Sequence, residues 1–318
     1  MSRCRAWTRF MSVALFVSTV SYSDVPTGFG IFSTEETVIG DRADFSGGSI
    51  GSNGNIRVGS DAEVIGSVIA GGNITVYDRS TVFGDATAAG NISLGNSSQV
   101  TGTTVQHTTV PAYTINSKSV STGTQNITVN HNQSLTLDPG PYRDVIVRDR
   151  AQLYLSSGVY NFKSLDIGSD GWVKFNISGD GVEINIQNGF ILSDRAKMEL
   201  VSGTAEDIVI YAGGSNEIRI GSNSKLHGSL TAPNAKVSVF SRAEVYGAIY
   251  ARRVELQPDV FTGGLIENWI TIDTDNDGVP DVVELEAGTD PFNPDDKPAA
   301  VVEGTFLNQT DDGLQKVK

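Results

Sequence analysis

Small and aliphatic residues recur at every sixth position from residue 58 to 104, and the pair Gly-Asn returns at every third six, as Gly54-Asn55, Gly72-Asn73 and Gly90-Asn91. A helix cannot use a strict period of six, because successive positions drift around its axis. A chain that turns a corner every six residues can, so that three short strands make a triangular coil and the next coil stacks about 4.8 Å away. The pattern therefore predicts an all-β fold, an elongated triangular β-solenoid with about 18 or more residues per coil.

The coil pattern extends over most of the chain. It predicts a first solenoid segment at residues 35–107 and a second at 126–264, joined by a connecting loop at 108–125 where the period of six is lost. In the second segment the coils lengthen, and apolar and polar residues alternate as in strands with one buried face. Residues 24–34 are expected to cap the N-terminal end of the rod, and the C-terminal end is expected near Gly263.

Residues 1–23 have the features of an export signal. Three arginines precede an apolar run at residues 10–20, and small residues lead to a cleavage point after Ser23. The run is about half as long as the roughly 20 residues that a membrane span needs. Cys4 is the single cysteine and leaves with the signal, so we expect no disulfide in the mature protein.

The charge of the mature chain is strongly negative. The signal holds three of the 23 basic residues and none of the 37 acidic ones, so its removal leaves a formal charge of −17. This balance argues against a nucleic-acid partner, which needs a basic face, and suits an exported protein that meets cations. No run of 20 apolar residues follows the signal, so we expect no stable membrane span. We predict a secreted, extracellular or cell-surface location, with the periplasm as an alternative.

The stretch DTDNDGVPDVVE, residues 273–284, carries oxygen donors at the spacing of a calcium loop. Acids stand at loop positions 1, 3, 5, 9 and 12, and Gly278 stands at position 6, where the chain must turn sharply. The residue at position 7 offers its carbonyl oxygen, and a short helix is expected at 281–287, ended by Gly288. The predicted Ca²⁺ ligands are Asp273, Asp275, Asp277, Val279, Asp281 and Glu284.

The longer stretch DTDNDGVPDVVELEAGTDPFNP resembles the thrombospondin type 3-like calcium repeats of exported bacterial proteins and, more loosely, dockerin and EF-hand loops. The resemblance implies a calcium-binding module at residues 265–297. Asp290, Asn293 and Asp295 leave open a second calcium ion, although no second complete loop follows them. Residues 298–318 are polar and mostly without pattern, and we expect a flexible tail there.

The solenoid resembles known repeats as well. Its short aliphatic hexads with glycine corners are similar to the bactofilin (polymer-forming) domain and other bacterial β-helices. Residues 125–256 resemble an uncharacterised domain of exported bacterial proteins, some of them linked to pili. The resemblance to bactofilins implies a structural polymer without a nucleotide cofactor. Hexapeptide acyltransferases share the period of six, but the sequence shows no clear catalytic histidine loop.

Asp-Arg pairs raise an enzymatic alternative, because polysaccharide lyases and β-helix glycoside hydrolases use acids and arginines on such a rod. The pairs all fall at the turn before the small residue of the repeat, which favours a structural ladder of charges at one corner. An enzyme instead needs acids that converge in one groove. The pairs are Asp41-Arg42, Asp78-Arg79, Asp149-Arg150 and Asp194-Arg195.

No other residues form a convincing catalytic or cofactor site. His107, His131 and His227 lie far apart and at unmatched repeat positions, which does not favour a metal or acid–base role. Threonines near residues 101–104 suggest an ice-binding face, but they do not recur at a step of 18. We therefore assign no catalytic residue.

The sequence favours a secreted or cell-surface structural or interaction protein, a β-solenoid scaffold stabilised by calcium at its C-terminal module. A carbohydrate-active β-helix enzyme is the alternative. Apart from calcium, the expected partners are a surface polysaccharide or envelope protein and a second copy of the chain. Self-association is expected through the rod ends, above all through residues 24–34 as the weaker cap.

Overall fold

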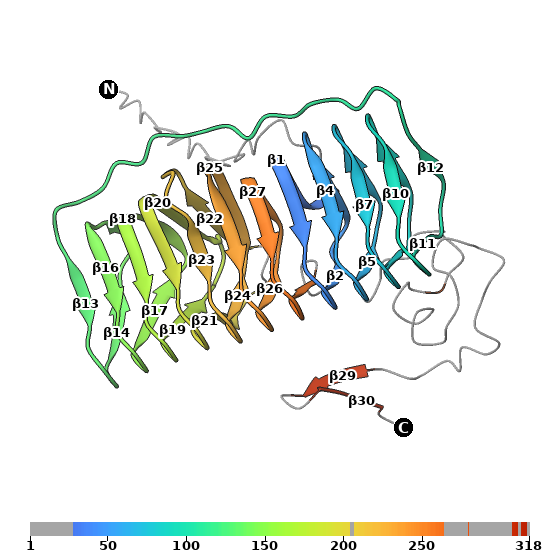
Figure 1. The fold of residues 1–318 in the computed structure, drawn as a ribbon. Coiled ribbons are helices and arrows are strands. Elements are labelled where there is room, and N and C mark those ends of the chain that lie inside the picture. The colour runs from blue at the N-terminus through green and yellow to red at the C-terminus, as the bar shows by residue number, and fades with distance from the viewer. Residues whose placement is uncertain (1–27, 204–206, 264–278, 280–306, 311–312, 317–318) are drawn as a thin grey trace, which may run out of the picture.

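The computed structural model describes residues 28–203, 207–263, 279, 307–310 and 313–316 (Figure 1). Within these ranges the secondary structure is all β, without α-helix, and the strands of successive coils stack in parallel into a rod. One sheet of the rod has 11 strands, one from each coil, so the rod has eleven coils. The predicted β-solenoid is confirmed.

The first segment has three faces, each a ladder of short parallel strands. The first face holds the start of β1 with β3, β6, β9 and β12; the second holds the end of β1 with β4, β7 and β10; the third holds β2, β5, β8 and β11. The strands are β1 (Phe29–Ile39), β2 (Asp44–Ser46), β3 (Ser49–Ser52), β4 (Asn55–Val58), β5 (Glu63–Ile65), β6 (Val68–Ala70), β7 (Ile74–Val76), β8 (Thr81–Val82), β9 (Ala86–Ala88), β10 (Ile92–Leu94), β11 (Gln99–Val100) and β12 (Thr104–Val105).

The second segment continues the same three faces with longer strands. The strands β18, β20, β25 and β27 run from the first face onto the second without ending at the corner. They are β13 (Ile127–Val129), β14 (Ser134–Leu137), β15 (Gly140–Pro141), β16 (Asp144–Val147), β17 (Gln152–Ser156), β18 (Gly158–Ile167), β19 (Trp172–Asn176), β20 (Val182–Leu192), β21 (Lys197–Ser202), β22 (Ile208–Ala212), β23 (Ile218–Ile220), β24 (Lys225–His227), β25 (Ser229–Val239), β26 (Glu244–Tyr246), β27 (Ile249–Leu256) and β28 (Phe261–Gly263).

The coils are not stacked in sequence order. β1 pairs with β3 and β4 along one edge and with β27 along the other, and β2 lies between β5 and β28. The first and last coils therefore meet in the middle of the rod, at an interface that we call the seam (Figure 1). The second segment ends with β28 at Gly263, where the sequence predicted its end. The prediction that residues 24–34 cap one end of the rod is wrong, because β1 is paired along both edges. The seam gives both coils a hydrogen-bonded neighbour, which removes two unpaired strand edges.

The ends of the rod are instead formed by β10–β12 and by β13–β15 (Figure 1). The connecting segment, residues 106–126, runs from one end to the other along the outside of the first face. Ile115 is buried against Phe29 and Phe32. The side chain of Asn53 exchanges two hydrogen bonds with the backbone of Tyr113, at 2.7 and 3.0 Å. The expected loop at 108–125 is thus a strap that covers one face.

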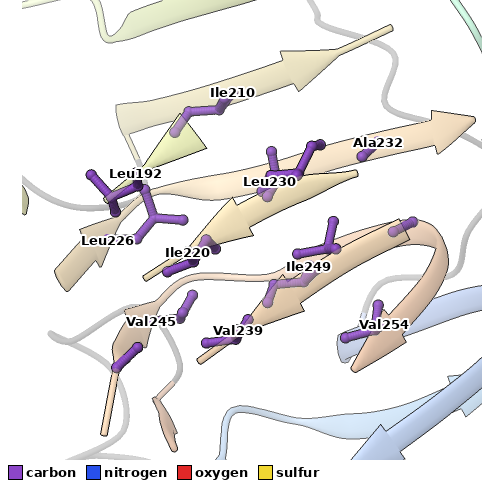
Figure 2. Close-up of a cluster of buried hydrophobic side chains, with 14 of the residues drawn as sticks. Leu192, Ile210, Ile220, Leu226, Leu230, Ala232, Val239, Val245, Ile249 and Val254 are labelled. Atoms are coloured by element: carbon purple, nitrogen blue, oxygen red, sulfur yellow. The ribbon is translucent and has the colours of Figure 1, made fainter. Parts of the chain in front are cut away.

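The core is a continuous column of inward side chains. Figure 2 shows part of it, where aliphatic residues from several coils pack together, among them Leu192, Leu230 and Ile249. In the first segment the inward residues are mostly valine, alanine and isoleucine. In the second segment, buried aromatic rings such as Phe162, Phe175 and Phe190 join them.

β29 (Leu307–Thr310) pairs antiparallel with β30 (Gly313–Lys316), so part of the stretch expected to be a flexible tail has secondary structure. The described residues contain no helix with the length and hydropathy of a membrane span. The signal peptide predicted at residues 1–23 lies outside the described residues.

Candidate functional site

Each coil places one residue in the left-handed backbone region at the corner between the second and third faces. The φ values lie between +55° and +61°, where few non-glycine residues are found. Five are arginines and three are aspartates, so opposite charges meet in neighbouring coils. In order along the rod the residues are Asn132, Arg150, Asp170, Arg195, Asn223, Arg242, Asp259, Arg42, Asp61, Arg79 and Ser97.

Three arginines of this corner ladder hold an aspartate of the adjacent coil with two hydrogen bonds. Arg79 donates to Asp61 through Nε and Nη2, both at 2.6 Å, and Arg195 donates to Asp170 at 2.8 and 3.0 Å. Arg42 donates in the same way across the seam to Asp259, at 2.7 and 3.2 Å. These hydrogen bonds lower the pKa of each aspartate.

The aspartates of the Asp-Arg pairs are part of the same corner. Oδ1 of Asp41, Asp78 and Asp194 accepts a backbone N–H from the next coil at 2.8, 2.8 and 2.9 Å. The acids are thus spread along the rod, one coil after another, as the prediction of a structural charge ladder requires. They do not converge as the acids of a catalytic groove would.

Asparagines form a second ladder at the corner between the first and second faces. The N–H of Asn73 donates to Oδ1 of Asn55 at 2.8 Å, and that of Asn91 donates to Oδ1 of Asn73 at 2.7 Å. On the third face Val64, Val82 and Val100 are register partners in successive coils. The predicted stacking of every third hexad is confirmed, with the detail that each side-chain oxygen accepts a backbone N–H.

The third face of the second segment carries a strip of lysines and aromatic rings that sequence analysis did not identify. Outward positions alternate with core positions along these strands, as the neighbours Trp172 (half-buried) and Val173 (buried) illustrate. The alternation in the sequence shows which residues point outward. It does not show which of them become neighbours, because the coils differ in length. The third-face strip consists of Tyr154, Trp172, Lys174, Lys197, Lys225 and Tyr246.

The lysines of the strip lie against its rings. Nζ of Lys174 is 4.2 Å from the centroid of Trp172, and that of Lys197 is 5.1 Å from it. Glu199 lies between Lys197 and Lys225, with N–O distances of 3.6 and 3.7 Å, and reduces the repulsion between these register partners. For Lys174 the structure gives ring contacts and no ion pair among the described residues, so its charge is available to a ligand.

A hollow of about 310 Å³ lies on the second face near the β13 end of the rod. Its lining includes His131, Arg148, Asp149 and Asp166. Partial burial raises the pKa of Asp166, and the charge of Asp149 raises it further. Two carboxyl groups in one hollow are an arrangement that acid–base catalysis uses, so this hollow is where the enzymatic alternative has its best support.

The three histidines lie in different places. His107 is at the β12 end, His131 lines the hollow, and His227 packs edge-on against Tyr246 next to the strip, with ring centroids 5.1 Å apart. Burial, with a smaller effect from the charge of Lys225, lowers the pKa of His227 to about 4. The structure does not bring the histidines together.

The predicted calcium ligands lie outside the described residues, apart from Val279, which is buried. Within the described residues no group of His, Cys, Asp or Glu could hold a metal ion. The metal site therefore rests on the sequence pattern of residues 273–284.

Comparison with protein families assigns the rod. Residues 28–262 match the model described as "Putative Ice-binding-like adhesive domain", and the chain belongs to this family. Residues 273–294 match the bacterial TSP3 repeat, as their resemblance to thrombospondin type 3-like repeats predicted. These matches do not support the expected resemblance to bactofilins. The comparison with curated proteins finds no match.

Solved structures of ice-binding proteins are similar to the chain at low identity. One from the Antarctic ascomycete Antarctomyces psychrotrophicus is 13% identical, with a TM-score of 0.35, covering 75% of this chain and 95% of that one. One from an Antarctic Biological Consortium is 14% identical, with a TM-score of 0.32 and coverages of 74% and 86%. One from an Antarctic Flavobacteriaceae bacterium is 13% identical, with a TM-score of 0.28 and coverages of 73% and 80%.

Proposed function

We propose that this protein is a secreted or cell-surface adhesive scaffold, and that its third-face strip binds acidic polysaccharide. The observation that carries the proposal is the strip itself, in which three lysines and three aromatic rings lie on neighbouring coils of one sheet. Aromatic rings offer apolar surface to the faces of sugar rings, and lysines form charge-assisted hydrogen bonds with carboxylates. The family assignment to an adhesive domain supports a role in attachment.

Titration of the protein with alginate or pectin by calorimetry tests the strip, with neutral dextran as the control polymer. Lys174→Ala should weaken binding about tenfold, because a charge-assisted hydrogen bond contributes about 1.5 kcal/mol. Trp172→Ala should also weaken binding, because it removes the apolar surface that a sugar ring would cover. Tyr77→Ala is the matched control, since Tyr77 is an exposed ring away from the strip. Equal binding by all variants would refute the strip as the adhesive surface.

Calcium is the second part of the proposal. The donor set of residues 273–284 fits this ion, because hard oxygen ligands stand at the positions that a calcium loop uses. Asp273, Asp275, Asp277, Asp281 and Glu284 would supply carboxylate oxygens and Val279 its carbonyl. Bound calcium would remove the repulsion between these acids and stabilise the module.

Calorimetry with calcium tests this site. Asp273→Ala or Glu284→Ala should abolish binding, while the circular dichroism of the rod stays unchanged. Asp312→Ala, an acid outside the loop, is the control and should bind as the wild type does. Retained affinity in both loop variants would rule out these residues as ligands.

A carbohydrate-active enzyme remains the second candidate, because the hollow holds Asp166 with a raised pKa beside Asp149. If it is correct, the protein should shorten an acidic polysaccharide, and Asp166→Asn should stop the reaction. Viscometry of the polymer measures this directly. Binding without any loss of viscosity favours the adhesive scaffold.

Ice binding is not part of the proposal, although the family description contains the term. The outward row of the second face includes the charged residues Asp166, Arg219, Glu255 and Arg57 at scattered positions. A regular ice-binding face would need a small polar side chain, such as threonine, at this position in each coil, and the row does not have one in every coil. A thermal hysteresis assay at high protein concentration should give no activity.

A further inference from the structure

Both ends of the rod present strands of the solenoid that are paired on one side only. At the β12 end, β10, β11 and β12 pair with β7, β8 and β9. At the β13 end, β13, β14 and β15 pair with β16, β17 and β18. Among the described residues no strand pairs with their outer edges. Such edges are templates for another chain.

Core side chains are exposed at both ends. Leu94 is the register partner of the fully buried Val76, yet it is 47% exposed. Leu135 is the register partner of the fully buried Leu153 and is 36% exposed. The hydrophobic column thus continues to each end, where a further coil would bury these leucines.

Each end of the rod has an incomplete coil, and the strands missing at one end are those present at the other. β12 lies on the first face and begins a coil that has no further strand on the other two faces. β13 and β14 lie on the second and third faces and belong to a coil that has no strand on the first. The β12 end of one copy and the β13 end of another would together complete one coil of three strands. All these strands are parallel, so the join preserves strand direction.

The corners of the two end coils also match. Asn91 and Asn126 each precede a strand that begins with isoleucine, and six residues later Ser97 and Asn132 are both left-handed, with φ of 57° and 58°. Asn126 already continues the asparagine ladder, because its Oδ1 accepts the N–H of Asp144 at 3.3 Å. In the joined rods, Oδ1 of Asn91 would accept the N–H of Asn126 from the next copy.

One side chain shields the β12 end. Within the rod, the N–H of Ile74 donates to the carbonyl oxygen of Asn91 in the next coil at 2.9 Å. At the end, the equivalent N–H of Ile92 donates to Oε1 of Gln106 at 3.1 Å. Gln106 therefore takes the place of the carbonyl oxygen that a further coil would supply.

We propose that the rods join head to tail, the β12 end of one copy against the β13 end of the next, and that Gln106 competes with this contact. A head-to-tail contact that does not close on itself generates filaments. The inference does not depend on the third-face strip, which lies on the side of the rod and stays accessible in a filament.

Sedimentation velocity on the purified full-length exported protein over a wide concentration range tests the inference. The wild type should associate as concentration rises, and Gln106→Ala should associate at lower concentration. Leu94→Glu and Leu135→Glu, each at an exposed site, should both be monomeric. An equimolar mixture of the two should form a 1:1 dimer, because each keeps one intact end. Ile191→Glu, exposed in the middle of the rod, is the control and should behave as the wild type does.

Other outcomes would overturn the inference. If Leu94→Glu alone forms dimers, like ends join and the head-to-tail contact is wrong. If the wild type and Gln106→Ala both stay monomeric at every concentration, the two ends of the rod do not bind each other.

Discussion

The two segments of the rod build the same triangular coil with different regularity. In the first, Ile56, Ile74 and Ile92 are register partners, and the step along the chain from each to the next is constant. In the second, Phe190 pairs with Leu165, and Arg219 pairs with Ile191, at steps that are longer and unequal. The inserted residues lengthen strands such as β18 and β20, whereas most strands of the first segment are short.

The difference shows what regularity requires of the core. In coils of equal length, each inward residue packs on the residue at the same position of the next coil. The first segment therefore uses inward side chains of nearly constant size, such as Val64 and Val82. Longer coils leave more interior volume, and rings such as Phe162 and Phe175 fill it, since interiors are close-packed. The second segment also carries the third-face strip. The regular first segment therefore extends the rod, and the irregular second segment carries the aromatic core residues and the third-face strip.

Removal of a core ring should have the largest effect on stability. Phe162→Ala should lower the free energy of unfolding by about 3–5 kcal/mol, because it leaves a large cavity. Val82→Ala, equally buried in the first segment, should cost about 2 kcal/mol. Urea denaturation measures both. Equal losses would contradict the view that the aromatic side chains support the wider coils.

His227 should make the second segment sensitive to acid. Its pKa is about 4 in the folded protein and close to 6.5 in the unfolded chain, so the unfolded chain gains the proton first as pH falls. The stabilising contribution is complete above pH 6.5 and is lost between pH 6.5 and 4, by on the order of 3 kcal/mol. His227→Gln should flatten this slope in urea titrations at several pH values.

The seam should depend on Glu36, which joins the two segments. Its carboxylate is 2.8 Å from Nη1 of Arg57 and 2.9 Å from Nη2 of Arg253, which comes from the last coil. Glu36→Ala should lower stability by about 1–2 kcal/mol, because it removes two part-exposed ion pairs that contribute up to about 1 kcal/mol each. Glu63→Ala, an exposed acid of the first segment, is the control for lost charge. If thermal melts show the same decrease in melting temperature for both variants, Glu36 has no special role in the seam.

The smallest effect is expected from one rung of the asparagine ladder. Asn73→Ala removes the acceptor for the N–H of Asn91 and should cost about 1 kcal/mol. Asn73→Asp keeps the oxygen and should cost less. A calorimetric melt that ranks the aspartate variant below the alanine variant would contradict the role of this oxygen.

The sequence was sufficient to predict the coil but not the order of the coils. Gly-Asn pairs and valines at a constant step specify which residues stack, because each coil repeats the one before it. No comparable pattern in the sequence predicts the pairing of Ile31 with Ile249. The alternation of apolar and polar residues shows which face of a strand is buried, but it does not show which strand pairs along its edge. The error about residues 24–34 follows from this.

The candidate sites divide in a similar way. The predicted calcium ligands lie close together in the chain, so their spacing alone is enough to predict them. The strip brings Trp172 next to Lys197, and Lys197 next to Lys225, across steps of unequal length. Because the step changes from coil to coil, no period in the sequence predicts that these side chains gather.

A disulfide across the seam tests the order of the coils most directly. Val38 and Glu255 are register partners on β1 and β27, and a strand spacing of about 4.8 Å lies within the Cα separation that a disulfide accepts. Cys4, the single natural cysteine, lies in the predicted signal and would not interfere after export. Val38→Cys with Glu255→Cys should form an intramolecular disulfide under mild oxidation, seen by mass spectrometry of the digested monomer, whereas Val38→Cys with Thr128→Cys should not. If the first pair stays reduced in the folded monomer, β1 and β27 are not neighbours and the seam is contradicted.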